Sequence, residues 1–478
     1  MPPNSPSSVA DLGRICRSSG VAAGLNRRRA VILLVSFCLA AASCMRAPPP
    51  SKPNIVLISF DTMRADFLRA YGDATTQTPH FDAFAREAAV FQNAFASSPF
   101  TPPSIWSLLR SVHIHESSYD TLFRVRYAAS PALAQRLRKA GYTTVGFTGS
   151  SILNRGSGYD AGFEAFFDTG NAPFHHNEKV FSRLDEFLDD FAEAPAKPFF
   201  LYAHFYDPHP QWADAPQRFH RYATGEQKAA ERYPRSFAAY RSEITWADDI
   251  WGRLLGKLNR RQLRDNTIVA FTSDHGFAFR EHYDTFGYVF HLFDEAIRIP
   301  FMLKAPGLKP RTIETPISLV DLGPTLLDLA GLGKTHGDGV SFLQRLKDPD
   351  EKAPVPVFAQ ASAMLPSQWE EGPYRNDFQS RYAAGVDNIH MMMVEDDFKL
   401  IHMPSRTPEQ FELYNRRVDP AEQTDIYDAQ NPRHREMAAR LLKQRGALAK
   451  RYPRHGKKDD AKAVAEAKER LRALGYVK

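Results

Sequence analysis

The chain has 478 residues, of which 43% are hydrophobic and 24% charged, and its formal net charge is +6. This is the composition of an ordinary globular protein, long enough for one large domain and a smaller one. The first 43 residues contain five arginines and one acidic residue, which leaves 56 basic against 54 acidic residues in the rest of the chain. The basic character therefore belongs mostly to the N-terminus, and it gives no electrostatic case for nucleic-acid binding.

The N-terminal segment has the three parts of a secretory signal. Arg27–Arg29 precede an apolar stretch from Ala30 to Ala42, and small residues follow. Ala41-Ala42-Ser43-Cys44 resembles a bacterial lipobox. Residues 1–43 are therefore predicted to be a lipoprotein-type signal peptide, with lipid on Cys44 holding the exported protein to a membrane of the bacterial cell envelope, as an outer-membrane lipoprotein or otherwise in the periplasm. A plain signal peptide and an uncleaved anchor stay open, although the apolar run is shorter than the ~20 residues of a spanning helix.

The three cysteines, Cys16, Cys38 and Cys44, all lie in this leader or at its end. The body of the protein is therefore predicted to have no disulfide and no thiol chemistry. Residues 44–53 contain Pro48-Pro49-Pro50 and are predicted to be a stiff linker.

Between residues 54 and 347, apolar strand-like runs alternate with helical patterns. This alternation predicts an α/β fold with a large, mostly parallel sheet flanked by helices. The predicted strands are 54–61, 143–148, 199–205, 267–275 and 299–304. The predicted helices are 131–139, 180–191, 237–258 and 319–329.

The pattern changes after residue 347. Short strand-like pieces at 382–386, 389–394 and 398–402 precede a helical stretch at 433–448. Residues 348–450 are therefore predicted to be a smaller C-terminal α+β subdomain. Residues 451–478 are predicted to be a charged helical tail.

Two buried apolar strands end in side chains that bind metals. Asn54–Phe60 runs into Asp61, and Thr267–Ser273 runs into Asp274 and His275. Because ligands bind beyond the carboxyl ends of strands in open α/β sheets, these ends can meet in one site. Carboxylate and imidazole together suit Zn, Mn or Fe better than Ca.

Thr101 begins a second candidate element. The sequence Thr101-Pro102-Pro103 before an apolar helical face predicts Thr101 as the N-cap and proline at the first helical position. Free N–H groups and the helix dipole favour an anion at such an end. A hydroxyl beside a divalent cation can also act as a nucleophile. From these residues alone, a simple capping role for Thr101 stays open.

An ordered set of motifs resembles the sulfatase family within the alkaline-phosphatase superfamily. The similarity runs from about Asn54 to the C-terminus, and the order of the motifs is more specific than any one of them. The matching segments are Asp61–Asp66 with Tyr71-Gly72, Phe100–His115, Asp207–His209, Ser273–Gly276, Arg298–Pro300, Asp321–Leu327, Glu412–Tyr414 with Asp419-Pro420, and Leu474–Tyr476.

The resemblance implies an alkaline-phosphatase-like fold and a role for each matching residue. Asp61, Asp274 and His275 would bind one divalent metal ion (Mn, Ca, Mg or Zn), and Thr101 would complete its shell as the nucleophile. His209 would lie near the leaving group or an ester oxygen, and His115 would have a further role after the nucleophile helix. His204 stays open between a packed histidine and a site residue.

Departures from the family pattern bear on the mechanism. Sulfatases proper convert a Cys or Ser in a Cys-x-Pro-x-Arg motif to formylglycine, but here Thr101 holds that position and Ile105 holds the position of the arginine. A threonine sulfate lacks the easy collapse of the formylglycine hydrate, whereas a threonine phosphoester can be attacked at phosphorus. A threonine at the nucleophile position resembles the phosphodiesterase and phosphoglycol-transferase branches of the superfamily.

Other departures remove charge from the site. Thr62 replaces a second acidic ligand, and Phe277 replaces an acidic residue after the Asp-His-Gly motif. Tyr288, Val289 and Phe290 stand where relatives often place Lys or His, with His291 displaced. His282 and Lys304 are candidates to compensate, although a surface position is expected for each.

The sequence thus predicts a formylglycine-independent hydrolase of sulfuric or phosphoric esters that acts through Thr101. The partner would be a small anionic ester, or a sulfated or phosphorylated glycan or lipid head group. A phosphodiesterase or phosphoglycol transferase is one alternative. A catalytically degenerate, ligand-binding lipoprotein is the other, and the lost charge motivates it.

Overall fold

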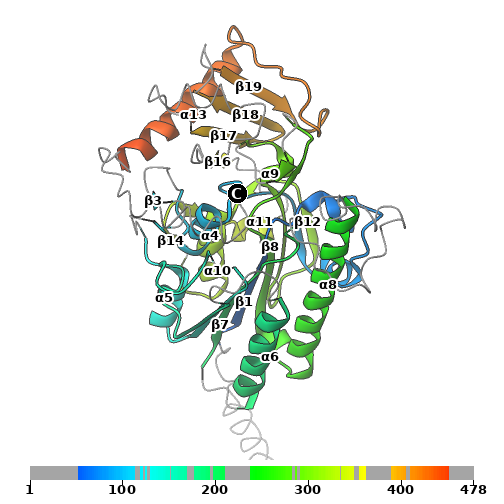
Figure 1. The fold of residues 1–478 in the computed structure, drawn as a ribbon. Coiled ribbons are helices and arrows are strands. Elements are labelled where there is room, and N and C mark those ends of the chain that lie inside the picture. The colour runs from blue at the N-terminus through cyan, green and yellow to red at the C-terminus, as the bar shows by residue number, and fades with distance from the viewer. Residues whose placement is uncertain are drawn as a thin grey trace, which may run out of the picture. The chain divides into compact units, whose positions relative to one another are not determined.

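The apolar runs predicted as buried strands form the middle of a nine-stranded sheet (Figure 1). The strand order is β12-β2-β11-β8-β1-β7-β5-β6, and β13 also pairs with β2. The bounds are β1 Asn54–Phe60, β2 Ala89–Phe95, β5 Thr143–Thr148, β6 Ala165–Asp168, β7 Phe199–Phe205, β8 Thr267–Ser273, β11 Arg298–Lys304, β12 Arg311–Ile313 and β13 Ile317–Ser318. From β8 to β6 the strands are parallel, whereas β11 is antiparallel to both β8 and β2. The predicted mostly parallel sheet is confirmed.

The computed structural model describes residues 52–113, 119–121, 124–125, 130–150, 152–169, 177–193, 197–209, 237–282, 286–287, 291–333, 335–348, 355–361, 389–404 and 410–451. The leader, Cys44, the predicted strand 382–386 and the predicted tail helix lie outside these residues, so export and lipidation stay predictions. Within the described ranges, no helix has both the length and the apolar character needed to cross a bilayer.

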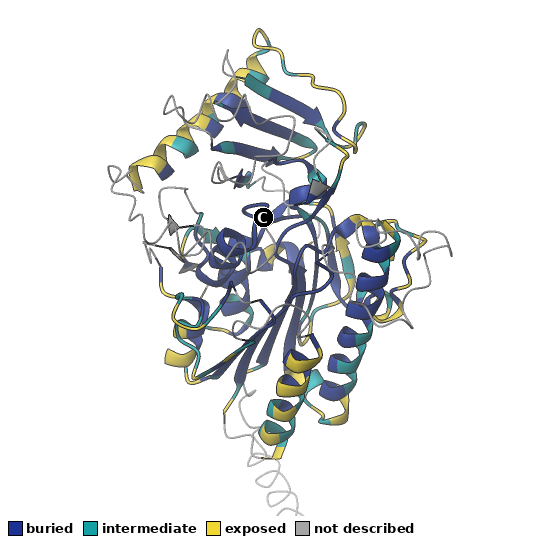
Figure 2. Cartoon of the chain, viewed as in Figure 1, coloured by how far each residue is buried: buried dark blue, intermediate teal, exposed yellow. Residues whose placement is uncertain are grey.

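Helices cover both faces of the sheet, and strand alternation assigns each side chain to a face. Ile55 and Leu57 pack with α4, α5, α10 and α11, whereas Val56 and Ile58 pack with α3, α6 and α8. The bounds are α3 Pro79–Ala85, α4 Thr101–Arg110, α5 Leu133–Lys139, α6 Asn177–Glu193, α8 Phe237–Arg260, α9 Asp294–Ile297, α10 Leu322–Leu329 and α11 Leu343–Lys347. The strands between the two layers are buried along their length (Figure 2). The four predicted helices are confirmed, the last as a 3-10 turn (Leu319–Asp321) that continues into α10.

Short elements join these layers. The 3-10 turns are Ala65–Phe67, Arg69–Tyr71 and Arg264–Asn266. The two-stranded pairs are β3 Tyr119–Thr121 with β4 Arg124–Val125, β9 Ala278–Phe279 with β10 Phe286–Gly287, and β14 Thr335–His336 with β15 Gly339–Val340.

The C-terminal subdomain is a four-stranded antiparallel sheet with one helix. It consists of β16 Val357–Ala361, β17 His390–Glu395, β18 Phe398–Met403, β19 Gln410–Asn415 and α13 Pro432–Arg451. Met391 and Met393 pack against α13, whereas Met392 and Val394 pack towards the large domain. The strands predicted at 389–394 and 398–402 are confirmed. The outer strands of this sheet, β16 and β19, are not among the predicted strands.

A buried ion network joins the two domains. Lys399 is fully buried, and its Nζ contacts Asp294, the Glu422 carboxylate at 2.7 Å and the Leu292 carbonyl oxygen at 3.1 Å. The Arg416 guanidinium also pairs with Asp294. Burial opposes ionisation of Asp294, but Arg416 and Lys399 outweigh it and hold the pKa of this carboxyl below its usual range. Burial and Asp294 raise the pKa of Glu422 to about 7.

Lys399→Met is expected to destabilise the protein by about 3–5 kcal/mol, because it leaves Asp294 and Glu422 buried without their shared cation. Urea denaturation would measure the loss. Arg417→Ala is the matched control, because its pair with Asp397 has an arginine side chain that is 75% exposed, and it should cost less than about 1 kcal/mol. Equal losses from the two variants would show that the network adds nothing beyond an exposed ion pair.

Candidate active site

Three neighbouring strands bring metal-binding side chains together on the α4 face of the sheet. Asp61 follows β1, Asp274 follows β8, and His204 lies on β7. One ligand atom from each of the three residues lies within 4.8 Å of the other two, and all three residues are buried. The parallel pairing explains this convergence, because Phe60 is in register with Ser273, and Ser59 with His204.

Backbone groups orient Asp274. Its Oδ1 accepts the N–H groups of Thr62 at 2.9 Å and of His275 at 2.7 Å. Its Oδ2 is buried without a hydrogen-bond partner and lies 3.5 Å from His275 Nε2. One carboxylate oxygen is therefore fixed by the protein, and the other is directed into the site.

The two carboxylates cannot both be ionised at low cost without a cation. Burial and the neighbouring Asp274 raise the pKa of Asp61 well above its usual range. Asp61 Oδ1 has no hydrogen-bond partner, and its Oδ2 lies 3.6 Å from His204 Nε2. Unpaired buried carboxylate oxygens beside an imidazole are the donor set of a divalent metal, so these residues fit the expected ion.

Thr101 is the first residue of α4, and Phe100 is the N-cap. The prediction of Thr101 as the N-cap is therefore wrong, since its hydroxyl points to the strand ends instead of capping the helix. Thr101 Oγ1 lies 3.2 Å from His275 Nε2. Ser104 Oγ donates to the Asp274 carbonyl oxygen, which ties the first turn of α4 to the end of β8.

His275 has one nitrogen left for the site. Its Nδ1 lies 2.7 Å from the Gly276 carbonyl oxygen and must donate there, because a carbonyl only accepts. Nε2 therefore presents a lone pair towards Thr101. Gly276 itself lies against the Glu295 carbonyl oxygen, where any Cβ would collide.

The loop after β7 adds His209 and Asp207. His209 is 1% exposed, and its ring stacks on Tyr206 with centroids 4.6 Å apart. Asp207 is fully buried, and neither of its carboxylate oxygens has a hydrogen-bond partner. Burial and the charge of Asp61 raise the pKa of Asp207 to about 8. Asp207 is not among the predicted site residues. Its place after an apolar strand, two residues before His209, is the sequence feature that could have indicated it.

The structure therefore brings together Asp61, Thr101, Asp274 and His275, and adds His204 as a third member of the ligand group. His115 lies outside the described residues, as do Tyr288, Val289 and Phe290.

Two of the side chains at the departures from the family pattern are apolar and buried. Ile105 is fully buried in the core on the α4 face, and Phe277 is also fully buried. Lys304 Nζ pairs with Glu87 at 2.7 Å, and His282 Nδ1 contacts Glu295 at 2.7 Å. Lys304 and His282, the two candidates for compensating charge, are thus each paired with a carboxylate outside the candidate metal-ligand group.

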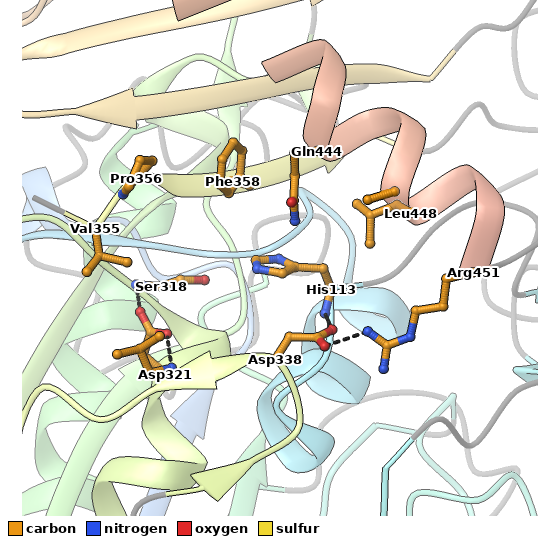
Figure 3. A pocket seen from close by; sticks show the side chains of 12 residues that line it. His113, Ser318, Asp321, Asp338, Val355, Pro356, Phe358, Gln444, Leu448 and Arg451 are labelled. Carbon is orange, nitrogen blue, oxygen red and sulfur yellow. Dashed lines mark hydrogen bonds and ion pairs between the residues drawn. The ribbon is translucent and has the colours of Figure 1, made fainter. Parts of the chain in front are cut away.

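A separate cavity of about 390 Å³ lies near the other end of α4 (Figure 3). Its lining contains none of the candidate metal ligands. Arg451 of α13 bonds to Asp338 there, and Asp338 Oδ2 accepts the His113 N–H at 3.1 Å. The other lining residues are Ser318, Asp321, Val340, Val355, Pro356, Phe358, Gln444, Ala447 and Leu448.

Comparison with known proteins identifies the family. The sulfatase family model matches residues 53–332, which is more than half of the chain, and the model of the C-terminal domain of N-sulphoglucosamine sulphohydrolase matches residues 283–450. The chain belongs to the sulfatase family.

The sequence identity to individual relatives is below 30%. The chain is similar to the ulvan-active sulfatase of Formosa agariphila, at 28% identity over 73% of this chain and 76% of the relative. It is also similar to the choline-sulfatase of Rhizobium meliloti, at 24% identity over 80% of this chain and 83% of the relative.

Solved structures share the fold. The structure of BT4656 in complex with its substrate D-glucosamine-2-N,6-O-disulfate superposes with a TM-score of 0.69 at 18% identity, over 85% of this chain and all of that one. The phosphonate monoester hydrolase of Agrobacterium radiobacter gives 0.64 at 20% identity, over 84% and 96% of the two chains.

Asp207→Asn is expected to stabilise the metal-free protein at about pH 8. The unfolded carboxyl ionises near its ordinary pKa of 3.8, whereas the folded one stays protonated up to about pH 8. The folded state therefore binds more protons between these values, and wild-type stability falls as the pH rises. Urea denaturation in EDTA should show a gain of about 1–3 kcal/mol at pH 8 that shrinks towards pH 4. The exposed Asp265→Asn is the control, and an Asp207→Asn effect that does not change with pH would contradict the assignment.

Proposed function

We propose that this protein is a metal-dependent ester hydrolase in which Thr101 is the nucleophile, acting on phosphate esters in preference to sulfate esters. The observation that carries the proposal is the position of Thr101 Oγ1. It lies at the N-terminus of a ten-residue helix, 3.2 Å from His275 Nε2.

Asp61, Asp274, His275 and Thr101 would hold one divalent metal. When bound, the metal would lower the pKa of the Thr101 hydroxyl and neutralise charge on the ester. The N–H groups at the start of α4 and the helix dipole favour the anionic ester at the same place.

The chain's own residues then account for the bond changes. Thr101 loses its proton to water, and its Oγ forms a bond to phosphorus while the bond from phosphorus to the leaving oxygen breaks. His209 donates a proton to that leaving oxygen. Water attacks the Thr101 phosphoester, and Thr101 regains its proton as inorganic phosphate or a phosphomonoester departs. An acceptor alcohol in place of water would give the transferase alternative.

The chemistry of Thr101 supports phosphorus over sulfur. The chain has no cysteine beyond Cys44, and Thr101 stands at the position that carries formylglycine in sulfatases proper. A threonine adduct has no hydrate through which to expel sulfate, whereas a phosphoester is open to attack by water. Ile105 stands where sulfatases proper carry an arginine, and the loss of that positive charge also suits an ester with a single negative charge, such as a phosphodiester.

Thr101→Ala and Asp274→Ala are each expected to lower kcat/KM for an aryl phosphodiester by about 1,000-fold or more. The first removes the proposed nucleophile, and the second removes a proposed metal ligand. Thr101→Ser should keep part of the activity. Mass spectrometry of quenched wild-type reactions should find a phosphorylated Thr101 peptide. Full activity of Asp274→Ala would refute the mechanism, and metal-loaded protein that binds the ester without cleaving it would favour the degenerate, ligand-binding alternative.

A paired assay tests the substrate class. Matched nitrophenyl esters of a phosphodiester and of sulfate, measured with one enzyme preparation, should give a higher kcat/KM for the phosphodiester by about 10-fold or more, or more than 1.4 kcal/mol. A preference for the sulfate that persists after fresh purification would overturn this part of the proposal. Thr101→Ala controls for a contaminating hydrolase.

A further inference from the structure

We propose that His204 is a metal ligand in this protein, and that it replaces the second acidic ligand absent at Thr62. The proposal rests on the proposed metal-dependent function, and it predicts a nitrogen-rich ligand set that prefers Zn²⁺ or Mn²⁺ over Ca²⁺ and Mg²⁺.

The position of His204 is the first argument. It belongs to the group with Asp61 and Asp274 whose ligand atoms all lie within 4.8 Å of one another. The three residues come from adjacent strands, and alternation puts them on one face, the face that α4 covers. His204 thus approaches the carboxylates from β7, on the side of β1 opposite to β8.

The hydrogen bonding of the ring is the second argument. Nδ1 lies 2.9 Å from Ser59 Oγ, and Ser59 Oγ lies 3.0 Å from the Tyr202 hydroxyl. With Nδ1–H donating to Ser59, Nε2 carries a lone pair directed at the carboxylates. Metal-binding histidines are commonly held in this way through their other nitrogen.

The unpaired state of Nε2 is the third argument. The residue is fully buried, and Nε2 has no hydrogen-bond partner. Its separation of 3.6 Å from Asp61 Oδ2 exceeds hydrogen-bond length. A cation between Nε2 and the carboxylate oxygens would satisfy all of these atoms together.

Thr62 explains why a ligand is needed from another strand. Its backbone has a φ of +56°, an unusual conformation for a β-branched residue, and its Oγ1 is buried without a partner. Asp adopts this conformation more readily than Thr. Thr62 thus has a backbone conformation that suits an aspartate but offers no carboxylate, whereas His204 offers a donor atom to the same group.

Metal binding to the full-length, metal-stripped protein tests the proposal. Titration calorimetry should show that His204→Gln lowers the affinity for Zn²⁺ and Mn²⁺ on the order of 100-fold, and Ser59→Ala about 10-fold through loss of the Nδ1 partner. Ca²⁺ affinity should change less, because Ca²⁺ prefers oxygen ligands. His402→Gln is the control, because His402 is buried in the C-terminal sheet and stacks on Phe411.

Adding Thr62→Asp to His204→Gln distinguishes the loss of a ligand from misfolding of the single variant. The Thr62→Asp/His204→Gln double variant should regain affinity and shift its preference towards Mg²⁺ and Ca²⁺. Pulsed EPR of the Cu²⁺-loaded protein should show one coordinated imidazole fewer in His204→Gln than in the wild type.

An unchanged imidazole count and unchanged Zn²⁺ affinity in folded His204→Gln would overturn the role of His204, whatever the protein hydrolyses. Wild-type protein that binds Zn²⁺ through His204 but cleaves no ester would leave the ligand assignment standing and remove the proposed function. Wild-type protein that binds no divalent metal would overturn both.

Discussion

The site depends on the unfavourable closeness of two buried carboxylates, Asp61 and Asp274. Each follows a parallel strand whose side chains are buried on both faces, so water does not screen the repulsion between the two charges. Burial, and after it the neighbouring charge of Asp274, raises the pKa of Asp61 well above its usual range. Under the proposed function a divalent cation would offset this repulsion, and Thr101, His275 and His204 would lie around it.

The fold supplies the rigidity that such a pair needs. Backbone N–H groups of Thr62 and His275 fix one oxygen of Asp274, and Ser104 ties the nucleophile helix to the same strand end. The C-terminal subdomain is fixed in turn through Lys399 and Asp294. The N–H groups of Gly276 and Phe277, directly after His275, donate to the carbonyl oxygens of Ala296 and Glu295 in α9. Asp294, which pairs with Lys399, is the first residue of the same helix. Domain packing and site geometry are thus connected through α9.

The changes relative to sulfatases proper form a consistent set. A threonine replaces the formylglycine precursor, a core isoleucine replaces the arginine, and a threonine replaces one acidic ligand. Each change removes charge or a specialised group from the substrate side. The buried carboxylates and imidazoles remain, which is consistent with the proposed metal-dependent hydrolase of phosphate esters.

The sequence by itself determined the strand ends and the helix that begins at Thr101. Apolar runs such as Asn54–Phe60, and prolines at a helix start such as Pro102, are local signals that need no knowledge of the partner strands. The convergence of Asp61, Asp274 and Thr101 was predicted from the family resemblance together with the rule for strand ends.

Only the tertiary structure decided which face and which neighbours each side chain has. His204 is one of several polar residues near apolar runs, and its meeting with Asp61 depends on β7 pairing with β1, which alternation along one strand does not encode. The buried state of Asp207 depends in the same way on packing between segments. The helix also starts one residue away from the predicted position, because the Thr101 hydroxyl bonds to His275, far away in the sequence, and a capping rule considers only the local backbone.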